Sequence, residues 1–121
     1  MARVMVVDDS PADTKKLKSI LAKGGHDIMS AESGREAIEL ARSQQPDCIV
    51  MDVVMPDVNG FQATRALTKG PLTAHIPVII VSAKDQPTDR LWATRQGARE
   101  YIVKPVKGSE LLEKIDALLR D

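Results

Sequence analysis

The sequence predicts an α/β fold in which five parallel strands alternate with five helices in one doubly wound domain. Short apolar runs recur along the chain without polar alternation, which is typical of strands buried on both faces of a parallel sheet. The segments between these runs carry apolar residues at helical spacing, and strands that alternate with helices form parallel sheets. At 121 residues the chain is long enough to build one such domain.

The strands are expected at five apolar runs, of which the second is the weakest: 4–7, 26–31, 48–51, 78–81 and 101–103. Each run is short and most are rich in β-branched residues, which favour strands. Cys48, the single cysteine, lies in one of these runs and is expected to be a small buried hydrophobic residue.

The helices are expected between and after the strands. The first follows Pro11, because proline fits the first turn of a helix. The second and the last show apolar stripes at 37–41 and 111–119. Gly60 is expected to shape the turn into the third helix. Trp92 is expected to be a structural anchor in the fourth, with a partner-facing aromatic as the less favoured alternative.

Charge and hydropathy exclude several classes of function. The 17 basic residues equal the 17 acidic ones, so the chain has no excess of positive charge for nucleic-acid binding. The chain contains no apolar run approaching 18 residues, and its beginning does not resemble a signal peptide. We therefore expect a cytoplasmic monomer that makes no direct contact with nucleic acid and does not insert into a membrane.

Polar side chains follow four of the predicted strands. Asp8 and Asp9 follow the first, Asp52 the third, Ser82 the fourth and Lys104 the fifth. In open parallel sheets these positions meet at one edge, where ligands bind. Two like charges about 4 Å apart repel by roughly 4 kcal/mol at an effective dielectric constant of about 20, so the adjacent aspartates require a compensating cation.

The residue types at this edge suit phosphoryl transfer. Carboxylates bind Mg²⁺, and an aspartate can act as the nucleophile in phosphoryl transfer. Asp52, which ends the middle strand, is the candidate nucleophile. A lysine ammonium and a serine hydroxyl, here Lys104 and Ser82, can donate hydrogen bonds to phosphoryl oxygens.

Four motifs in this order resemble the receiver domains of two-component response regulators, the CheY-like superfamily. They are "VDDS" at 7–10, "MDVVMPDVNGF" at 51–61, "VIIVSAK" at 78–84 and "YIVKPV" at 101–106. The resemblance implies a flavodoxin-like, CheY-like fold in which residues 1–121 form the receiver domain, with no output domain.

The resemblance also implies roles for individual residues. Asp52 is expected to be the phosphoacceptor, with Ser82 and Lys104 binding the phosphoryl group and the Lys104–Pro105 peptide bond cis. Asp8, Asp9, Asp52 and the backbone carbonyl of Val54 are expected to hold Mg²⁺. Tyr101 matches the family's aromatic switch position, although a packed edge residue explains it equally well.

The implied function is a signalling switch that catalyses only its own phosphorylation and dephosphorylation. A CheA-like histidine kinase would supply the phosphoryl group from its phosphohistidine. Phosphorylation would shift the face built by the fourth helix, fifth strand and fifth helix, and thereby control binding of a protein target that the sequence does not name. "NGFQATRALTK", "IPVIIVSAKDQ" and "RQGAREYIVKPV" resemble single-domain regulators of twitching motility in type IV pilus systems.

Three alternatives remain beside this function. The chain could be a phosphate sink for another regulator, or a receiver fold that binds partners without phosphate. An aspartyl-phosphate hydrolase would need a second acid two residues after its nucleophile, but Ser10 and Val54 occupy those positions. Val54 and Ser82 also depart from many receivers, which carry a polar residue and a threonine there, so the lifetime of the aspartyl phosphate is expected to differ.

Overall fold

The strands form one open sheet in the computed structural model, which describes residues 2–120. All neighbouring strands are parallel and their order is β2-β1-β3-β4-β5. The bounds are β1 (Arg3–Val7), β2 (Asp27–Ala31), β3 (Cys48–Asp52), β4 (Val78–Ser82) and β5 (Glu100–Val103). The predicted fold class is confirmed, and the strand order reverses between β1 and β3, which is where ligands bind in such sheets.

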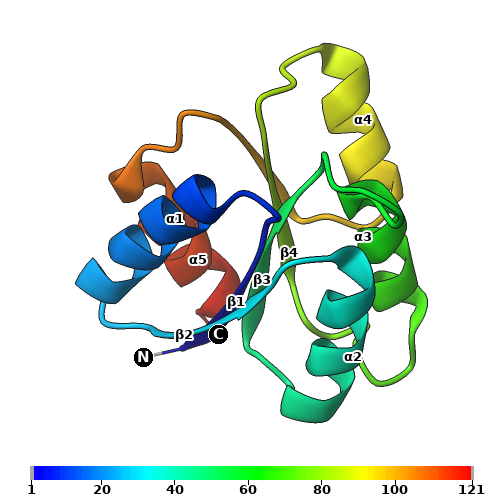
Figure 1. Cartoon of the computed structure of the whole chain (residues 1–121), viewed down its shortest axis with the longest axis horizontal. Coiled ribbons are helices and arrows are strands. Elements are labelled where there is room, and N and C mark those ends of the chain that lie inside the picture. The colour runs from blue at the N-terminus through cyan, green and yellow to red at the C-terminus, as the bar shows by residue number, and fades with distance from the viewer. Residues whose placement is uncertain (1, 121) are drawn as a thin grey trace.

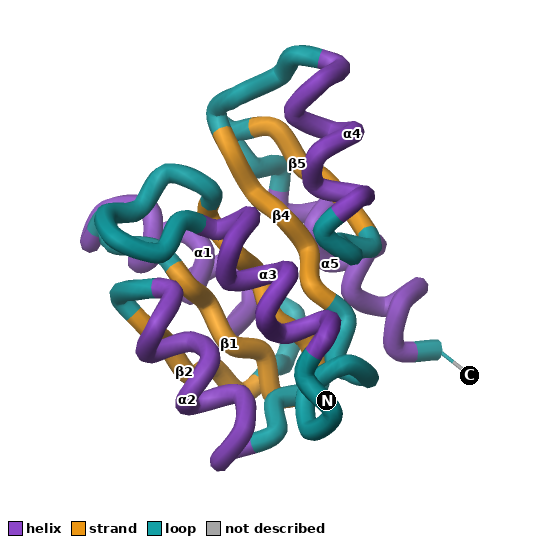
Figure 2. The backbone as a smooth tube through the Cα atoms, turned by 90° about the vertical axis from the view of Figure 1, so that its right-hand side faces the viewer, coloured by secondary structure: helices purple, strands orange, loops and turns teal. Residues whose placement is uncertain are grey.

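The helices cover both faces of the sheet (Figure 1). One face carries α1 (Pro11–Lys23) and α5 (Gly108–Leu119), whose apolar stripes pack against it. The other face carries α2 (Gly34–Gln44), α3 (Gly60–Lys69) and α4 (Pro87–Arg95), and Figure 2 shows this layer in front of the strands. The sheet therefore lies between two helical layers. A ligand can reach the strands at their ends but not across the two covered faces.

Two hydrophobic clusters, one on each face, hold the layers together. Successive side chains of a strand point to opposite faces. In β3 this alternation sends Ile49 and Met51 to one cluster, and Cys48 and Val50 to the other. Cys48 is fully buried, and desolvation raises the pKa of its thiol to about 12. The predicted role of this cysteine as a small buried hydrophobic residue is confirmed.

Local side-chain contacts fix where the helices begin. The Ser10 hydroxyl caps α1 by accepting a hydrogen bond from the Asp13 N–H at 3.3 Å, and Pro11 occupies the first turn. Asn59 and Gln62 form a reciprocal capping box at the start of α3. Both helices therefore start at defined positions, α1 shortly after β1 and α3 after the loop of residues 53–59 that follows β3.

Gly60 lets α3 start against the end of β3. Its N–H donates to the Val53 carbonyl at 2.9 Å. A Cβ at this position would collide with the backbone oxygen of Asp52, so only glycine permits the close approach. The loop that carries Asp52 is thus packed tightly against the first residue of α3.

Helix α4 differs from the other helices in how little of it is buried. Ala93 is its one buried residue, and Trp92 is 53% exposed. The expectation that Trp92 is a structural anchor is therefore wrong, because its ring faces outward beside Arg95. Between residues 2 and 120, we find no helix with the length and apolar content needed to cross a membrane.

Candidate functional site

The carboxyl ends of β1 and β3 bring three aspartates together. Asp8 follows β1, Asp52 ends β3, and these two strands are hydrogen-bonded neighbours. One oxygen from each of Asp8, Asp9 and Asp52 lies within 4.8 Å of the others. Asp8 and Asp52 are buried, whereas Asp9 is exposed. Two of the negative charges are therefore largely removed from water and need a compensating positive charge.

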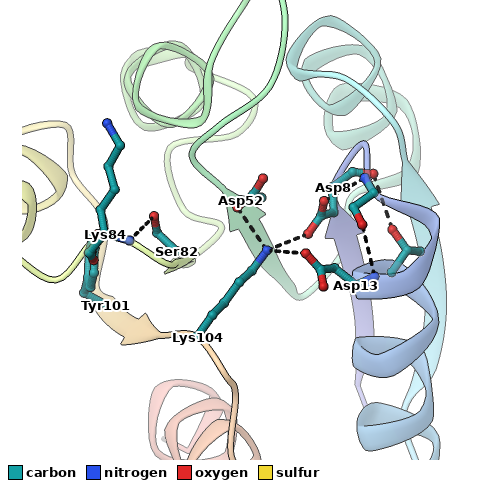
Figure 3. Close-up of polar contacts among 9 residues, drawn as sticks. Asp8, Asp13, Asp52, Ser82, Lys84, Tyr101 and Lys104 are labelled. Atoms are coloured by element: carbon teal, nitrogen blue, oxygen red, sulfur yellow. Dashed lines mark hydrogen bonds and ion pairs between the residues drawn. The ribbon is translucent and has the colours of Figure 1, made fainter.

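Lys104 supplies a positive charge to this cluster (Figure 3). It follows β5, and its Nζ lies 3.2 Å from Asp8 Oδ2 and 3.3 Å from Asp52 Oδ1. Nζ also lies 2.8 Å from Oδ2 of Asp13, a residue in the first turn of α1. The ammonium thus compensates charges that come from two strands and one helix.

The pKa of Asp52 reports the balance of these charges. Burial and repulsion from Asp8 together raise it to about 6, against the opposing effect of Lys104. For Lys104, burial alone would lower the pKa, but the hydrogen bond to Asp13 and the charges of Asp52 and Asp8 raise it above its ordinary value. Lys104 is therefore fully charged, and Asp52 is ionised at neutral pH.

The turn between β1 and α1 holds Asp8 and Asp13 in place. Asp8 Oδ1 accepts a hydrogen bond from the Ser10 N–H at 2.9 Å, and the Thr14 hydroxyl donates to the Asp8 carbonyl at 3.4 Å. The N-cap bond from the Asp13 N–H to Ser10 then sets the position of Asp13. One short turn therefore positions two of the three carboxylates that surround Lys104, those of Asp8 and Asp13.

Sequence reasoning missed Asp13. The reason is that it lies on a helix, whereas the other site residues were found by looking directly after strands. A signal existed, because an acid in the first turn of a helix is stabilised by the helix dipole and its position near the strand end is predictable. The residue therefore belongs to the charged cluster although no strand end carries it.

Ser82 and Tyr101 lie on the other side of Asp52. Ser82 ends β4 and is buried, and its Oγ accepts a hydrogen bond from the Lys84 N–H at 3.1 Å. The Tyr101 hydroxyl donates to the Lys84 carbonyl at 2.7 Å, and Arg90 lies 5.2 Å from the centroid of the Tyr101 ring. Both predicted switch residues thus contact the backbone of Lys84, whose side chain runs away from Asp52 (Figure 3).

The remaining predicted residues flank this arrangement. Val54, two positions after Asp52, is 62% exposed. The Lys104–Pro105 peptide bond is cis. Within residues 2–120, Asp8, Asp9, Asp52 and Lys104 form one cluster, and Ser82 is joined to it through the backbone, where the Lys104 N–H donates to the Ser82 carbonyl at 2.8 Å.

Comparison with known families identifies this arrangement. The family model of the response regulator receiver domain matches residues 4–116. The chain belongs to the response regulator receiver family. This match runs from β1 into α5, so the family covers the sheet and all of the site residues described above.

Curated relatives of this receiver domain fall into two kinds. Protein PilH of Pseudomonas aeruginosa is 54% identical over 119 residues, which cover 98% of each chain. The transcriptional regulatory protein AfsQ1 of Streptomyces coelicolor is 34% identical, and the match covers 99% of this chain but 52% of AfsQ1. The chain thus spans nearly all of PilH and about half of the transcriptional regulator.

Solved structures share the same receiver fold. The chemotaxis protein CheY4 of Vibrio cholerae superposes with a TM-score of 0.91 at 28% identity, covering 98% of this chain and 99% of the other. The receiver domain of a sensor histidine kinase from Pseudomonas aeruginosa gives a TM-score of 0.92 at 25% identity, covering 99% and 98%. In that structure a magnesium ion is coordinated in the active-site cleft.

These similarities agree with the chemistry of the carboxylate cluster. Receiver domains accept phosphoryl groups from histidine kinases and bind Mg²⁺ at an acidic pocket. Three carboxylate oxygens within 4.8 Å of one another are the hard oxygen ligands that Mg²⁺ prefers, and the partly exposed edge leaves room for water. The cluster therefore fits the ion.

Proposed function

We propose that this receiver domain is a Mg²⁺-dependent signalling switch in which Asp52 accepts a phosphoryl group from the phosphohistidine of a CheA-like histidine kinase. The observation that carries the proposal is the surroundings of Asp52. Its carboxylate is buried, lies 3.3 Å from Lys104 Nζ and shares a cluster with Asp8 and Asp9. A nucleophile, a cation for the phosphoryl group and ligands for a metal are thus assembled at one edge of the sheet.

The transfer step follows from the charge state of Asp52. Because its pKa is about 6, the carboxylate is ionised at neutral pH and one oxygen can attack the phosphorus atom. The new O–P bond forms as the P–N bond to the kinase histidine breaks, and the imidazole leaves with that electron pair. Lys104 and the Ser82 hydroxyl would stabilise the charge on the equatorial oxygens.

Three side chains and one backbone group are the proposed metal ligands. Asp8, Asp9, Asp52 and the Val54 carbonyl would hold Mg²⁺, with Asp9 as a direct ligand. When bound, the ion would supply positive charge that neutralises the carboxylates and the transferring phosphoryl group. The domain would catalyse only its own phosphorylation and dephosphorylation.

The switch would operate through the backbone of Lys84. A phosphoryl group on Asp52 would attract the Ser82 hydroxyl, which now accepts from the Lys84 N–H. Loss of that hydrogen bond would free the loop whose carbonyl holds the Tyr101 hydroxyl. The populations of the conformations of the α4-β5-α5 face would then shift, and this shift would change the affinity of the face for a protein target.

The likeness to PilH supports a role in type IV pilus motility, because identity of 54% extends over nearly the whole of both chains. Output would be a contact with another protein in the cytoplasm rather than with DNA. A receiver that serves as a phosphate sink for a second regulator would use the same phosphoryl-transfer chemistry. It would differ from the switch in having no protein target of its own. A receiver fold that works without phosphate is disfavoured by the intact cluster of Asp8, Asp52 and Lys104.

The test is the intact mass of the protein after incubation with acetyl phosphate. We expect one added phosphoryl group with Mg²⁺, none in the presence of EDTA, and none in Asp52→Asn. Phosphorylation of Asp9→Ala should depend much less on the Mg²⁺ concentration than that of the wild type, because one metal ligand has been removed. Phosphorylation of Asp52→Asn at the wild-type rate would contradict the assignment of the phosphoacceptor.

A folded wild-type protein that gains no phosphoryl group and also fails to bind beryllofluoride would favour the phosphate-independent function. Circular dichroism of each variant serves as the control for folding. If Asp9→Ala is phosphorylated at the wild-type rate at every Mg²⁺ concentration, the assignment of the metal ligands is wrong. The assignment of Asp52 as the phosphoacceptor would still hold.

A further inference from the structure

Lys104 has one partner that neither phosphoryl transfer nor metal binding uses. The shortest of its ion pairs, at 2.8 Å, is with Asp13 on α1, and the pairs with Asp8 and Asp52 are longer at 3.2 and 3.3 Å. Asp13 is neither at a strand end nor in the carboxylate cluster that fits Mg²⁺. An acid that contacts the phosphoryl-binding lysine without contacting the phosphoryl group requires an explanation.

We propose that Asp13 is a positioning residue that retains Lys104 in the unphosphorylated protein and competes with the phosphoryl group for its ammonium. The inference rests on the proposed function of Asp52 and Lys104. Its consequence is that Asp13 lowers the affinity of the site for a phosphoryl group, and so weights the switch toward its resting state.

Two carboxylates, those of Asp8 and Asp13, accept hydrogen bonds from Lys104, and the Asp52 carboxylate lies close beside it. A lysine ammonium has three N–H donors and no acceptor. In this structure three carboxylates, those of Asp8, Asp13 and Asp52, surround it within 3.3 Å. A phosphoryl oxygen that binds Lys104 therefore competes with carboxylates that already hold the ammonium.

Asp13 is the partner that is released at least cost. Its side chain is 45% exposed, whereas those of Asp8 and Asp52 are 1% and 10% exposed. Breaking an ion pair leaves a buried carboxylate without solvation, but an exposed one is rehydrated. A hollow of about 290 Å³ lined by Asp13, Leu17 and Val106 opens beside the pair and gives water access to it.

The backbone keeps Asp13 in position while Lys104 moves. The Asp13 N–H is bound to the Ser10 cap, and Ser10 itself donates its N–H to Asp8. The acid therefore stays near the site at the start of α1 whether or not Lys104 is paired with it. This makes Asp13 an acceptor to which Lys104 returns when the phosphoryl group leaves.

The competition predicts opposite effects on two ligands. Removal of the Asp13 carboxylate frees a donor of Lys104 for a phosphoryl oxygen and also removes one negative charge. Binding of a phosphoryl mimic should therefore become tighter and binding of Mg²⁺ alone somewhat weaker. A variant that merely damaged the fold would weaken both.

The experiment measures the affinity for beryllofluoride at saturating Mg²⁺, and for Mg²⁺ alone, by isothermal titration calorimetry. We expect Asp13→Asn to bind beryllofluoride about two- to fivefold more tightly than the wild type, the size expected for loss of a partly exposed ion pair. Asp13→Ser also removes the carboxylate and should give the same result. Asp57→Asn is the matched control, because Asp57 is exposed in the loop after β3 and its left-handed backbone suits asparagine.

A second readout follows Lys104 directly. The NMR signal of its ammonium group, identified by its loss in Lys104→Met, should shift in Asp13→Asn and stay in place in Asp57→Asn. Equal beryllofluoride affinity in Asp13→Asn and Asp57→Asn, or an unmoved Lys104 signal, would overturn the inference. If the wild type itself binds no beryllofluoride with Mg²⁺, the proposed function fails instead.

Discussion

The two sides of the Asp52 site are built in different ways. On one side Asp8, Asp13 and Asp52 surround Lys104, so charged groups from distant parts of the chain hold one another within 3.3 Å. On the other side Ser82 and Tyr101 are neutral, and each forms a hydrogen bond with the backbone of Lys84. The first side is a network of charges, and the second is a pair of single hydrogen bonds.

This difference suggests that one side fixes the geometry around Asp52 and that the other side changes conformation. Charges taken from water are expensive to separate, so the acidic side keeps its geometry. A neutral hydrogen bond contributes about 1 kcal/mol net, so the bonds at Lys84 exchange easily. Reaction geometry therefore depends on the buried Asp8 and Asp52 carboxylates, and conformational change on the hydrogen bonds at Lys84.

The largest expected effect comes from removing the cation of the acidic side. Lys104→Met should lower the free energy of unfolding by about 3 kcal/mol, because it leaves the buried Asp8 and Asp52 carboxylates without compensation. Urea unfolding without Mg²⁺ measures the loss.

Lys114→Met is the matched control for this prediction. Lys114 pairs with Glu100 at 3.1 Å, but both side chains are more than a third exposed. Removal of such a pair should cost less than about 1 kcal/mol. If the two variants lose the same stability, the buried carboxylates of the acidic side do not depend on Lys104 for compensation.

A smaller effect of opposite sign is expected from neutralising Asp52. Its pKa of about 6 lies above the ordinary value of 3.8 because burial and Asp8 disfavour the charged form. The folded state therefore bears a cost above pH 6 that is absent below about pH 4. Asp52→Asn should raise the free energy of unfolding by about 2 kcal/mol at pH 7.5 without metal.

The pH dependence decides whether this explanation is correct. The advantage of Asp52→Asn over the wild type should shrink as the pH falls from 6 to 4, since Asp52 of the folded wild type then takes up a proton. Urea unfolding at a series of pH values in EDTA measures it. A difference that does not change with pH would indicate a packing effect instead.

The smallest effect on stability is expected on the side of the site that Ser82 and Tyr101 form. Tyr101→Phe removes the hydroxyl that donates to the Lys84 carbonyl but keeps the ring beside Arg90. Because the carbonyl is exposed and can bind water, the free energy of unfolding should fall by at most about 1 kcal/mol. Thermal unfolding measures this change, and a loss as large as that in Lys104→Met would remove the contrast between the two sides.

The fold and the charged cluster were predictable because they follow from one rule of topology. Apolar runs become strands, parallel strand ends meet at one edge, and so Asp8, Asp52 and Lys104 had to converge. The same rule could not place Asp13, because this residue lies on a helix. It also could not predict the hydrogen bond from Tyr101 to the Lys84 carbonyl, because a bond to the backbone does not depend on which side chain is at position 84.

The wrong expectation for Trp92 has a related cause. An aromatic residue in a short helix is expected to be buried when the helix has an apolar face, but α4 buries only Ala93. Leu91 and Trp92 consequently face outward. The amount of a helix that a sheet covers depends on the neighbouring helices, and a single segment of sequence does not contain that information.

The burial of Cys48 makes this protein convenient for site-directed labelling. Its thiol is fully buried and its pKa is about 12, so at neutral pH it is protonated and out of reach of alkylating reagents. A cysteine introduced at Lys84, which is exposed, would therefore react alone without prior removal of Cys48. Spin labels or fluorophores could then follow the loop after β4 in an otherwise native background.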